Sequence, residues 1–209
     1  MPAAHAALAP HADSPGRGRP REFDVDEVLD KAIAVFCERG YHATSIGDLT
    51  AATGLASGSV YKAFGDKRGL YIAALDRYKA VRDAELRAAL APAPDGRARV
   101  RVALTHYAEA SHGARGRLGC FVVGSAAELA TFDDELSRRA AAALRRNETL
   151  LTGLLREGRA DGSIPDHVDP EITGRLLLCL IQGMRVVGKT GTQRKDMLAL
   201  VDIAMKTVA

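Results

Sequence analysis

Small polar side chains surround a glycine in the segment from residue 57 to residue 62. If this segment is helical, four of its residues face outward: Ser57, Gly58, Ser59 and Lys62. Hydroxyl and amine groups of this size can hydrogen-bond the edges of bases, and a glycine lets the backbone come close to a partner. The segment therefore predicts a surface that enters the major groove of double-stranded DNA.

Sequence patterns of catalytic and metal sites are missing from the chain. No nucleophile elbow (G-x-S-x-G), P-loop, H-E-x-x-H helix or dinucleotide-binding glycine pattern occurs. No two of the six histidines are four residues apart, as convergent metal ligands on a helix would be. Asp133 and Asp134 are adjacent, so they would point apart on a helix, and a helix-capping role suits one of them better. We therefore predict that the protein is not an enzyme and binds neither a cofactor nor a metal ion, a metal site assembled across two subunits being the alternative.

The three cysteines, at positions 37, 120 and 179, are far apart and odd in number, which argues against a disulfide framework. Cys120 is expected at the start of a helix and close to Arg115 and Arg117. A helix N-terminus and nearby cations both lower the pKa of a thiol and so favour the reactive thiolate. One hypothesis is therefore that Cys120 senses oxidants or electrophiles. The alternative is that Cys120 is a small buried hydrophobe, the role that we expect for Cys179 in its apolar surroundings.

Apolar residues recur at helical spacing along most of the chain, and no segment alternates as a half-buried strand would. Asp24 is a capping residue before the first such segment, and Gly40 follows its end. We predict an all-α fold with three N-terminal helices and about six more. The expected helices cover residues 25–39, 44–53, 57–64, 67–90, 97–111, 119–130, 133–159, 170–187 and 193–208.

The second and third of these helices are short and joined through Gly54, as in a helix-turn-helix. Gly54 can adopt the left-handed conformation that the turn requires, and Leu55 would anchor the turn in the core. Ala51 and Ala52 are small, and we expect them where the two helices approach each other. Such a motif would present the polar face described above to DNA.

The sequence from Thr44 to Leu75, TSIGDLTAATGLASGSVYKAFGDKRGLYIAAL, resembles the DNA-binding domain of the TetR family of repressors. The segments Gly119–Ala130 and Leu180–Gly191 resemble the C-terminal part of one branch of that family. The resemblance implies a homodimeric repressor that binds operator DNA and is released from it by a small-molecule effector. Activation in place of repression and DNA binding without a ligand are alternatives.

The resemblance also implies which residues hold the DNA backbone. Thr44 and Ser45, at the start of a helix, would bind a phosphate through hydroxyl and backbone N–H groups. Tyr61 and Lys62 would contact phosphates or flanking bases, a position in the core being the alternative for Tyr61. Lys67 would bind a further phosphate beside the dipole of the long helix that it opens.

Base contacts would come from Ser57, Gly58 and Ser59, by the same resemblance. The chain departs from the family at two neighbouring positions, because Ala56 stands where Ser or Thr is common and Ser57 stands where Lys is common. Ala56 cannot cap the helix through its side chain, which costs about 1 kcal/mol unless Ser57 caps it one residue later. Without the lysine, we expect weaker phosphate binding at this helix.

The sequence divides into three parts. Residues 1–21 are expected to be a flexible basic arm, residues 22–66 the DNA-binding domain, and residues 67–209 a domain for effector binding and dimerisation. The arm would place its arginines in the minor groove, a solvated linker being the alternative. These arginines are Arg17, Arg19 and Arg21.

An effector pocket is expected among the helices at residues 67–90, 97–111, 119–130 and 133–159. Its candidate contact residues are His106, Tyr107 and Cys120, and the alternative for His106 is an ordinary core or surface position. An effector that binds one conformation better than another would shift the population and change the spacing of the two DNA-reading heads.

The last two helices are rich in apolar residues, from which we predict a four-helix interface between two subunits. Burial of both helices within one subunit is the alternative. A two-fold protein would bind a pseudo-palindromic operator. The expected interface residues are Leu176, Leu177, Leu180, Ile181, Met184, Val187, Leu198, Val201 and Met205.

The composition agrees with a folded helical protein: of 209 residues, 47% are hydrophobic and 26% are charged, and tryptophan is absent. The net charge of +3 permits nucleic-acid binding without requiring it. No apolar run reaches the roughly 18–20 residues of a membrane span, and the N-terminus does not resemble a signal peptide. We therefore expect a cytoplasmic protein with no membrane partner. A helical scaffold without sequence-specific DNA binding is the remaining alternative.

Overall fold

The computed structural model describes residues 23–129 and 132–209. The predicted arm, with Arg17, Arg19 and Arg21, lies outside the described residues. Within them the chain forms ten α-helices, two short 3-10 helices and no strand, so the predicted all-α fold is confirmed. The elements are α1 (Val25–Arg39), α2 (Ile46–Thr53), α3 (Ser57–Phe64), α4 (Lys67–Leu90), α5 (Gly96–Glu109), α6 (Gly113–Leu118), α7 (Phe121–Leu129), α8 (Asp134–Ala160), α9 (Pro170–Val187), η1 (Gly188–Thr190), α10 (Arg194–Ala204) and η2 (Met205–Val208).

Several helices begin at an aspartate that accepts hydrogen bonds from the first turn. The distance from Asp26 N to Asp24 Oδ1 is 2.8 Å at the start of α1. The distance from Gly69 N to Asp66 Oδ1 is 2.7 Å at the start of α4. Asp133 caps α8 in the same way, which is the role predicted for one of the two adjacent aspartates. These local caps explain why α1, α4 and α8 start within one residue of the predicted positions.

The structure contains one helix that the sequence analysis did not predict. The helix expected over residues 119–130 is α7 alone, and the unpredicted α6 comes before it. Gly119 separates the two helices, because its φ of 80° belongs to the left-handed region and ends α6. α6 has only 6 residues, two of them glycine, so it carries no apolar periodicity for the sequence to reveal.

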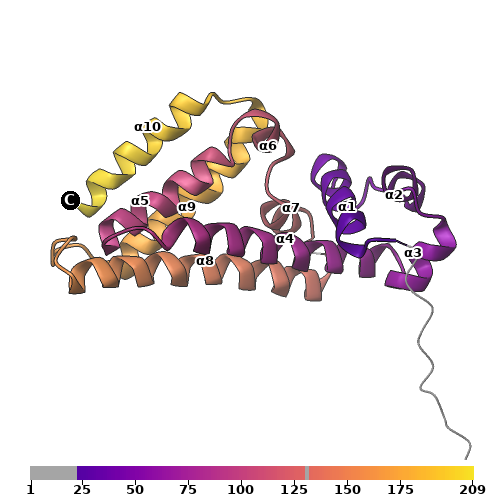
Figure 1. Cartoon of the computed structure of the whole chain (residues 1–209), viewed down its shortest axis with the longest axis horizontal. Helices are drawn as coiled ribbons and strands as arrows, with labels where there is room; N and C mark the ends of the chain where they lie inside the picture. The colour runs from indigo at the N-terminus through magenta and orange to yellow at the C-terminus, as the bar shows by residue number, and fades with distance from the viewer. Residues whose placement is uncertain (1–22, 130–131) are drawn as a thin grey trace, which may run out of the picture.

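Two long helices, α4 and α8, give the molecule its length (Figure 1). α1, α2 and α3 lie toward one end of α4, whereas α5, α9 and α10 lie toward its other end. Ion pairs join α4 to α8, with 2.9 Å between Asp76 and Arg139 and 2.6 Å between Asp83 and Arg146. α4 therefore connects the helix-turn-helix to the rest of the molecule as one continuous element.

The buried side chains form two clusters. The first holds α1, α2, α3 and the first half of α4 together, and it includes Phe121 and Leu129 of α7 and Leu136 of α8. The second is formed by α5, α8, α9, α10 and the last turns of α4. The first cluster crosses residue 66, where the sequence suggested a domain boundary, so packing fixes α7 to the helix-turn-helix end of the molecule.

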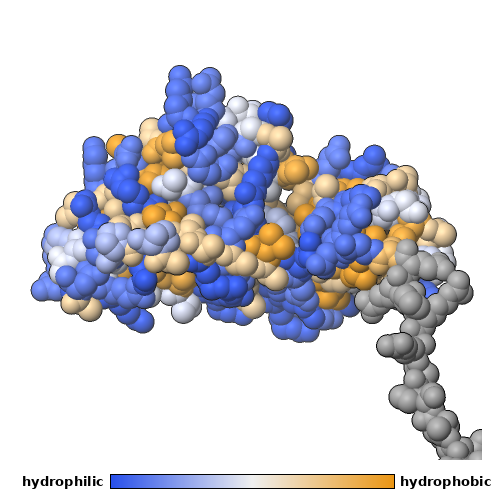
Figure 2. Space-filling model, in the orientation of Figure 1, coloured by the Kyte–Doolittle hydropathy of each residue, from blue (hydrophilic) through white to orange (hydrophobic). Residues whose placement is uncertain are grey.

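Hydrophilic side chains cover most of the face shown in Figure 2, and apolar side chains reach the surface there in separate patches. Large apolar side chains that are exposed gather mainly on two helices. Among the described residues, α9 and α10 carry six of them: Ile172, Leu176, Val186, Val187, Leu200 and Ile203. In the same part of the chain, no helix is long and apolar enough to cross a membrane.

Replacement of Gly96 by alanine is expected to destabilise the protein by about 2 kcal/mol. The first turn of α5 packs directly on α8, and a Cβ atom on residue 96 would overlap the backbone N and Cα of Gly158. Because these are backbone atoms, no side-chain rotation can relieve the overlap. Urea-induced unfolding at a fixed protein concentration measures the loss.

Gly153→Ala is the matched control, because residue 153 lies inside α8 and a Cβ atom there would meet no atom within 4 Å. This variant is expected to be more stable than wild type by about 0.5–1 kcal/mol, since alanine loses less backbone entropy than glycine in a helix. Equal free energies of unfolding for the two variants would contradict the close approach of α5 and α8.

Candidate nucleic-acid interface and central cavity

α2 and α3 meet at a turn that local interactions define. A capping box opens α2, with 3.1 Å from Asp48 N to Ser45 Oγ and 2.9 Å from Ser45 N to Asp48 Oδ2. Gly54 ends α2 with φ 75° and ψ 7°, the left-handed conformation that the turn requires. The Leu55 N–H then donates to the hydroxyl of Thr53 at 3.3 Å. The sequence therefore folds locally into the predicted helix-turn-helix.

α2 packs through Leu49 and Thr53, which are one turn apart and buried. Ala51 and Ala52 are exposed, so the prediction that they lie where the two helices approach each other is wrong. Positions i and i+4 share one face of a helix, so burial of residues 49 and 53 turns the two alanines toward solvent.

α3 packs through Val60, which is 0% exposed, and its opposite face is open to solvent. A Cβ atom on residue 58 would meet no atom within 4 Å, so the fold itself does not require glycine there. Tyr61 is 51% exposed and therefore does not belong to the core. The exposed residues of α3 include Ser57, Gly58, Tyr61 and Lys62, and Ser59 is half-buried.

The start of α3 has no side-chain cap, because its N-cap residue is Ala56 and no side chain bonds to the first turn. The N–H groups at the start of a helix have no partner within the helix, and the helix dipole is positive there. An anion such as a DNA phosphate can satisfy both the N–H groups and the dipole. The missing cap therefore leaves an exposed helix end that suits an anion.

Thr44 and Ser45 use their hydroxyl groups within the protein. Thr44 is buried, and its Oγ1 donates to the carbonyl of Gly40 at 2.5 Å. Ser45 Oγ lies 2.7 Å from Asp48 Oδ2 and also accepts the Asp48 N–H. The structure thus gives both hydroxyls a role in closing the loop and capping α2, in place of the phosphate contact that the resemblance implied.

Lys67 also points inward. Its Nζ donates to the carbonyls of Tyr41 and Thr44, both at 2.9 Å, and lies 4.3 Å from the centre of the Tyr41 ring. The ammonium group therefore holds the loop between α1 and α2 against the start of α4, a geometry that does not fit the expected phosphate contact. Lys62 is the one lysine or arginine within α2 and α3.

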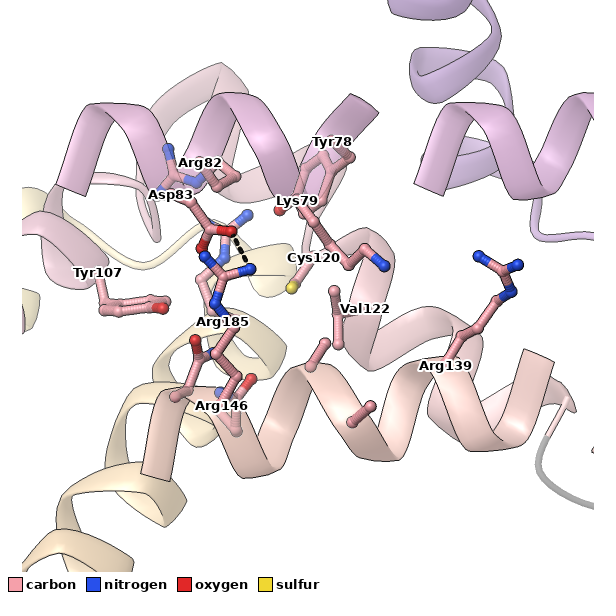
Figure 3. A pocket seen from close by; sticks show the side chains of 14 residues that line it. Tyr78, Lys79, Arg82, Asp83, Tyr107, Cys120, Val122, Arg139, Arg146 and Arg185 are labelled. Carbon is pink, nitrogen blue, oxygen red and sulfur yellow. Dashed lines mark ion pairs between the residues drawn. The ribbon is translucent and has the colours of Figure 1, made fainter. Parts of the chain in front are cut away.

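A cavity of about 240 Å³ lies farther along the molecule, among α4, α5, α7, α8 and α9 (Figure 3). Tyr107 and Cys120, two of the predicted contact residues, line it. The third, His106, does not, and its Nε2 lies 2.8 Å from Arg82 Nη2. Burial, followed by the charge of Arg82, lowers the pKa of His106 to about 4, so the imidazole is neutral near pH 7.

α9 contributes Gln182 and Arg185 to the cavity wall, and the sequence analysis assigned neither to a site. Arg185 is buried, and its Nη2 donates to the carbonyl of Gly119. The signal in the sequence is a glutamine and an arginine three residues apart in the otherwise apolar stretch 176–187, a spacing that places both on one face of the helix.

Cys120 immediately precedes α7, close to its predicted place at a helix start. The cations around it differ from those expected. Arg115 pairs with Glu85 at 2.7 Å. Arg185 lies near Cys120, because its guanidinium bonds to the carbonyl of the preceding residue. α9 therefore supplies a positive charge near this thiol.

The other two cysteines have different surroundings. Burial, followed by the charge of Cys120, raises the pKa of Cys37 to about 12, which keeps the Cys37 thiol protonated and unreactive. Cys179 is exposed on α9, so the prediction that it is buried is wrong. Cys179 shares the outer face of α9 with the exposed Leu176, whereas Leu177 and Ile181 pack inward.

Two family models match the chain. Residues 28–74 match the family described as "Bacterial regulatory proteins, tetR family", and residues 96–197 match "Tetracyclin repressor-like, C-terminal domain". Over 194 residues, covering 91% of each protein, the chain is 31% identical to the HTH-type transcriptional repressor ComR of Escherichia coli. The chain belongs to the TetR family. The predicted family is thereby confirmed, with the helix-turn-helix of a DNA-binding transcriptional regulator.

Solved structures of TetR-family proteins share this fold. A cysteine mutant of the regulator CifR has a TM-score of 0.81 and 31% identity, with 92% of this chain and 100% of that chain covered, and was solved with 26-bp double-strand operator DNA. SCO4454 of Streptomyces coelicolor has a TM-score of 0.76 at 23% identity, covers 87% of this chain and 94% of its own, and supports the fold alone. The TetR fold therefore extends through both halves of the chain.

α7 joins the cavity of this TetR-family protein to its helix-turn-helix end. The carboxylate of Glu128, near the end of α7, accepts the Tyr41 N–H at 2.8 Å and the His42 N–H at 2.7 Å. Gly40 packs so closely on the same carboxylate that a Cβ atom there would lie 2.6 Å from Glu128 Oε2. α7 begins at the cavity wall and ends at the loop after α1, so one short helix contacts both the cavity and the helix-turn-helix end of the molecule.

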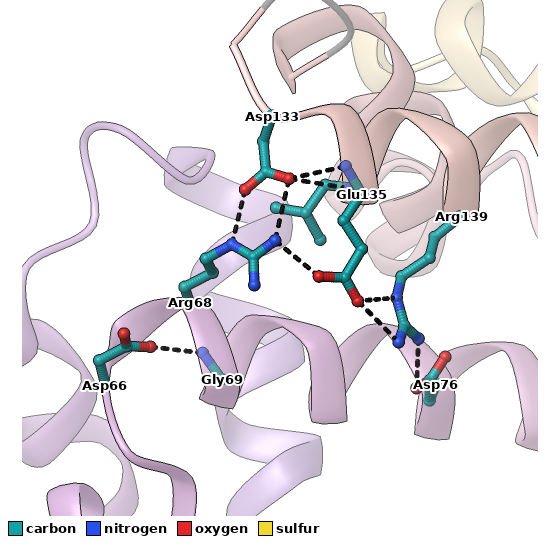
Figure 4. A network of polar contacts seen from close by, with 8 residues as sticks. Asp66, Arg68, Gly69, Asp76, Asp133, Glu135 and Arg139 are labelled. Atoms are coloured by element: carbon teal, nitrogen blue, oxygen red, sulfur yellow. Dashed lines mark hydrogen bonds and ion pairs between the residues drawn. The ribbon is translucent and has the colours of Figure 1, made fainter.

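Arg68 makes a second connection, near the start of α4 (Figure 4). Its Nε lies 2.6 Å from Asp133 Oδ2, and its Nη2 lies 2.8 Å from Glu135 Oε2. Glu135 also binds Arg139, which reaches back to Asp76 of α4. The hydrogen bonds from Arg68 and from the backbone of α8 lower the pKa of Asp133 to about 2. The start of α8 is therefore held on α4 by groups that stay charged near pH 7.

The predicted dimer-interface residues separate into two groups in this TetR-family chain. Leu176 and Val187 are exposed, and Leu180 and Leu198 are half-buried. The remaining five face the second core cluster, so their expected contact with a partner is corrected to burial within the subunit: Leu177, Ile181, Met184, Val201 and Met205. The nearly continuous apolar sequence of α9 conceals which of its faces packs inward.

Proposed function

We propose that this TetR-family protein is a homodimeric repressor that binds a pseudo-palindromic operator and leaves it when a small molecule occupies the cavity. The observation that carries the proposal is the exposed polar face of α3 with its uncapped start, in a chain similar to CifR, which was solved with operator DNA. The protein would act in the cytoplasm, where the operator lies.

DNA contacts would come from one side of α3. Residues 57–59 would face base edges, and Tyr61 and Lys62 would contact phosphates or flanking bases. Burial of Val60 on the opposite side supports this, because it fixes the direction in which α3 points its polar face. A phosphate would bind the uncapped N–H groups at the start of α3. The arm would add minor-groove contacts through Arg17, Arg19 and Arg21.

Dimerisation would use the outer face of α9 and α10. Ile172, Leu176 and Val186 are exposed on α9, and Ile203 is exposed on α10. Gly183 lies on the same face of α9, and a Cβ atom there would meet no atom within 4 Å, which leaves room for a partner helix to come close. A second copy on this face would form a four-helix interface and present two α3 helices to two half-sites.

Release from the operator would pass through α7. Cys120 and Val122, at the start of this helix, line the cavity, and Glu128 near its end holds the loop after α1. A ligand that binds better to one position of α7 would shift the population toward it. Because the loop after α1 is bonded to α7, the helix-turn-helix would move with it.

A second candidate trigger is alkylation of Cys120. Cys120 lines the cavity, and so does Arg185, whose guanidinium bonds to the carbonyl of the residue before Cys120. Addition of the Cys120 thiol across an activated C=C bond would form an S–C bond while the C=C π bond breaks and the thiol proton passes to the neighbouring carbon, and the product would fill the cavity covalently. Electrophile-induced release of DNA that is unchanged in Cys120→Ser would exclude this trigger.

A footprint on DNA upstream of the protein's own gene is the first experiment. Protection of an inverted repeat at physiological salt is the result expected for a dimeric repressor. If there is no protection there, selection from genomic fragments extends the search to distant operators. The proposal is wrong if that selection also returns no preferred sequence.

Lys62→Ala is expected to weaken operator binding at least about tenfold and to reduce its salt dependence. A dimer would lose two phosphate contacts, each worth about 0.9 in the slope of log K against log salt concentration, so the slope should fall by about 2. Fluorescence anisotropy at several salt concentrations measures both effects. Lys206→Ala, at an exposed lysine of η2, is the control and should leave the slope unchanged. An unchanged slope in Lys62→Ala would remove Lys62 from the interface.

A further inference from the structure

Arg185 is a buried cation without a carboxylate partner in the part of the chain that the structure describes. It is 3% exposed, and its Nη2 donates to the Gly119 carbonyl while its Nη1 has no hydrogen-bond partner. A guanidinium group has five N–H donors and stays charged at any physiological pH. A charge that is buried without a counter-charge costs far more free energy than a paired one. Arg185 therefore has a role other than stabilising this state of the protein.

The remaining cations around the cavity do not share this feature. Each forms an ion pair with a carboxylate: Lys79 with Asp76, Arg82 with Glu85, Arg139 with Glu135, and Arg146 with Asp83. Figure 3 shows the ion pair between Asp83 and Arg146 at the cavity wall, with Arg185 close to it and drawn without an ion pair. The unpaired positive charge of the wall is thus concentrated on Arg185.

Gln182 adds a second unsatisfied group to the same wall. Both Nε2 and Oε1 of its side chain are buried and have no hydrogen-bond partner. Gln182 lies three residues before Arg185, so both side chains leave α9 on one face and both line the cavity. Buried polar groups are normally satisfied by protein, water or ligand, so two neighbouring exceptions at a cavity indicate a place for a polar ligand group.

Two tyrosines complete the polar part of the wall. Burial raises the pKa of Tyr107 to about 12 and also raises that of Tyr78, so both hydroxyls remain protonated and can donate hydrogen bonds. Apolar side chains, among them Val122 and Ala143, line other parts of the cavity. The cavity therefore combines donors around one charged group with an apolar surface.

We propose that the cavity binds a small monocarboxylate with an apolar body, and that its carboxylate pairs with Arg185. The planar guanidinium matches a carboxylate through two parallel N–H···O bonds, which favours this anion over a neutral oxygen compound. The Gln182 amide and the tyrosine hydroxyls supply further hydrogen-bond donors to the carboxylate, and the apolar part of the ligand packs on the apolar side chains of the cavity. This inference rests on the proposed function, in which the cavity is the effector site.

The carboxylate also competes with an existing bond. Arg185 holds the Gly119 carbonyl, directly before Cys120 and the start of α7. A carboxylate that binds the guanidinium of Arg185 weakens the hydrogen bond from Arg185 to the Gly119 carbonyl. The reason is that a charged acceptor binds a guanidinium more strongly than a neutral carbonyl does. Ligand binding is thereby linked to the position of α7.

Calorimetric unfolding of the full-length protein without DNA tests the inference. The probes are benzoate, hydrocinnamate and octanoate, each compared with its neutral amide at matched ionic strength. We expect at least one carboxylate to raise the melting temperature in a saturable way while its amide does not. We expect Arg185→Gln to raise the dissociation constant of that carboxylate at least about tenfold.

Two further variants separate charge recognition from folding. Arg185→Lys keeps the positive charge but lacks the planar guanidinium with its two parallel N–H groups. It should bind the carboxylate with an affinity between those of wild type and Arg185→Gln. Arg99→Gln removes an arginine that pairs with Glu157 on the surface, away from the cavity, and should bind as wild type. The inference is overturned if every carboxylate behaves like its amide, or if carboxylate binding survives in Arg185→Gln.

Operator release is measured separately, by anisotropy of labelled operator with the same carboxylate. Saturable binding that depends on Arg185 and also releases DNA supports the ligand class and the effector role together. Such binding without release supports the ligand class and overturns the effector role of the cavity. Operator binding with no response to any carboxylate in either assay overturns the ligand class and leaves DNA binding in place.

Discussion

A double variant with Leu176→Glu and Ile203→Glu is expected to be monomeric and to bind the operator at least about 100-fold more weakly than wild type. Both side chains are exposed on the outer face of α9 and α10, so glutamate should not disturb the subunit itself. In a dimer, however, each interface would bury four carboxylates near the two-fold axis, at a high desolvation cost. A monomer carries only one helix-turn-helix, so it loses the gain in operator affinity that comes from binding two half-sites at once. Sedimentation velocity and operator anisotropy measure the two effects.

The matched control places glutamate at exposed apolar residues elsewhere. Val81→Glu on α4 and Leu118→Glu on α6 make the same chemical change outside α9 and α10. This double variant should stay dimeric and keep its operator affinity. A dimeric Leu176→Glu, Ile203→Glu protein would place the subunit contact on another surface.

Glu128→Ala is expected to destabilise the protein by about 3 kcal/mol and to uncouple the helix-turn-helix from the cavity. The variant loses two charge-assisted hydrogen bonds, to the N–H groups of Tyr41 and His42, each worth about 1.5–3 kcal/mol before allowance for partial exposure. The loop after α1 then keeps its bonds to Lys67 but loses those to α7. Urea unfolding measures the stability, and hydrogen exchange of the Tyr41 and His42 amides should become faster.

Coupling gives this variant a second readout. The ratio of operator affinities without and with a releasing ligand, which is typically 5–150-fold in allosteric proteins, should fall toward one. Glu38→Ala, at an exposed glutamate of α1, controls for the loss of one negative charge and should keep both the stability and the ratio. Slow exchange of the two amides in Glu128→Ala would show that α7 does not hold this loop.

Helix positions could be predicted because their causes are local. Asp24, Asp66 and Asp133 each accept hydrogen bonds from residues two or three positions later, and Gly54 ends α2 through its own backbone conformation. The short, glycine-containing α6 lacks such signals. The start of α6 is placed by a close approach between the backbones of Gly188 and Ser111, a contact between distant segments that no local pattern reveals.

The direction of polar side chains could not be predicted, because distant backbone groups determine it. Thr44 and Lys67 have the residue types of phosphate ligands, yet carbonyl groups of the loop after α1 accept their hydrogen bonds. Arg185 becomes part of a cavity only once α4, α5 and α8 surround α9. The outward face of α3 was more accessible to prediction, since burial of Val60 alone orients an amphipathic helix of this length.

The outer face of α3 is also independent of the folding of the protein. Residue 58 has open space around it, and Ser57, Tyr61 and Lys62 are exposed. Substitutions at these positions can therefore accumulate with little cost in stability, while Val60 and the core below it stay unchanged. After a gene duplication, one copy could acquire a different operator through a few surface changes and keep the same ligand and the same partner helices. The fold thus separates the evolution of DNA specificity from that of ligand specificity.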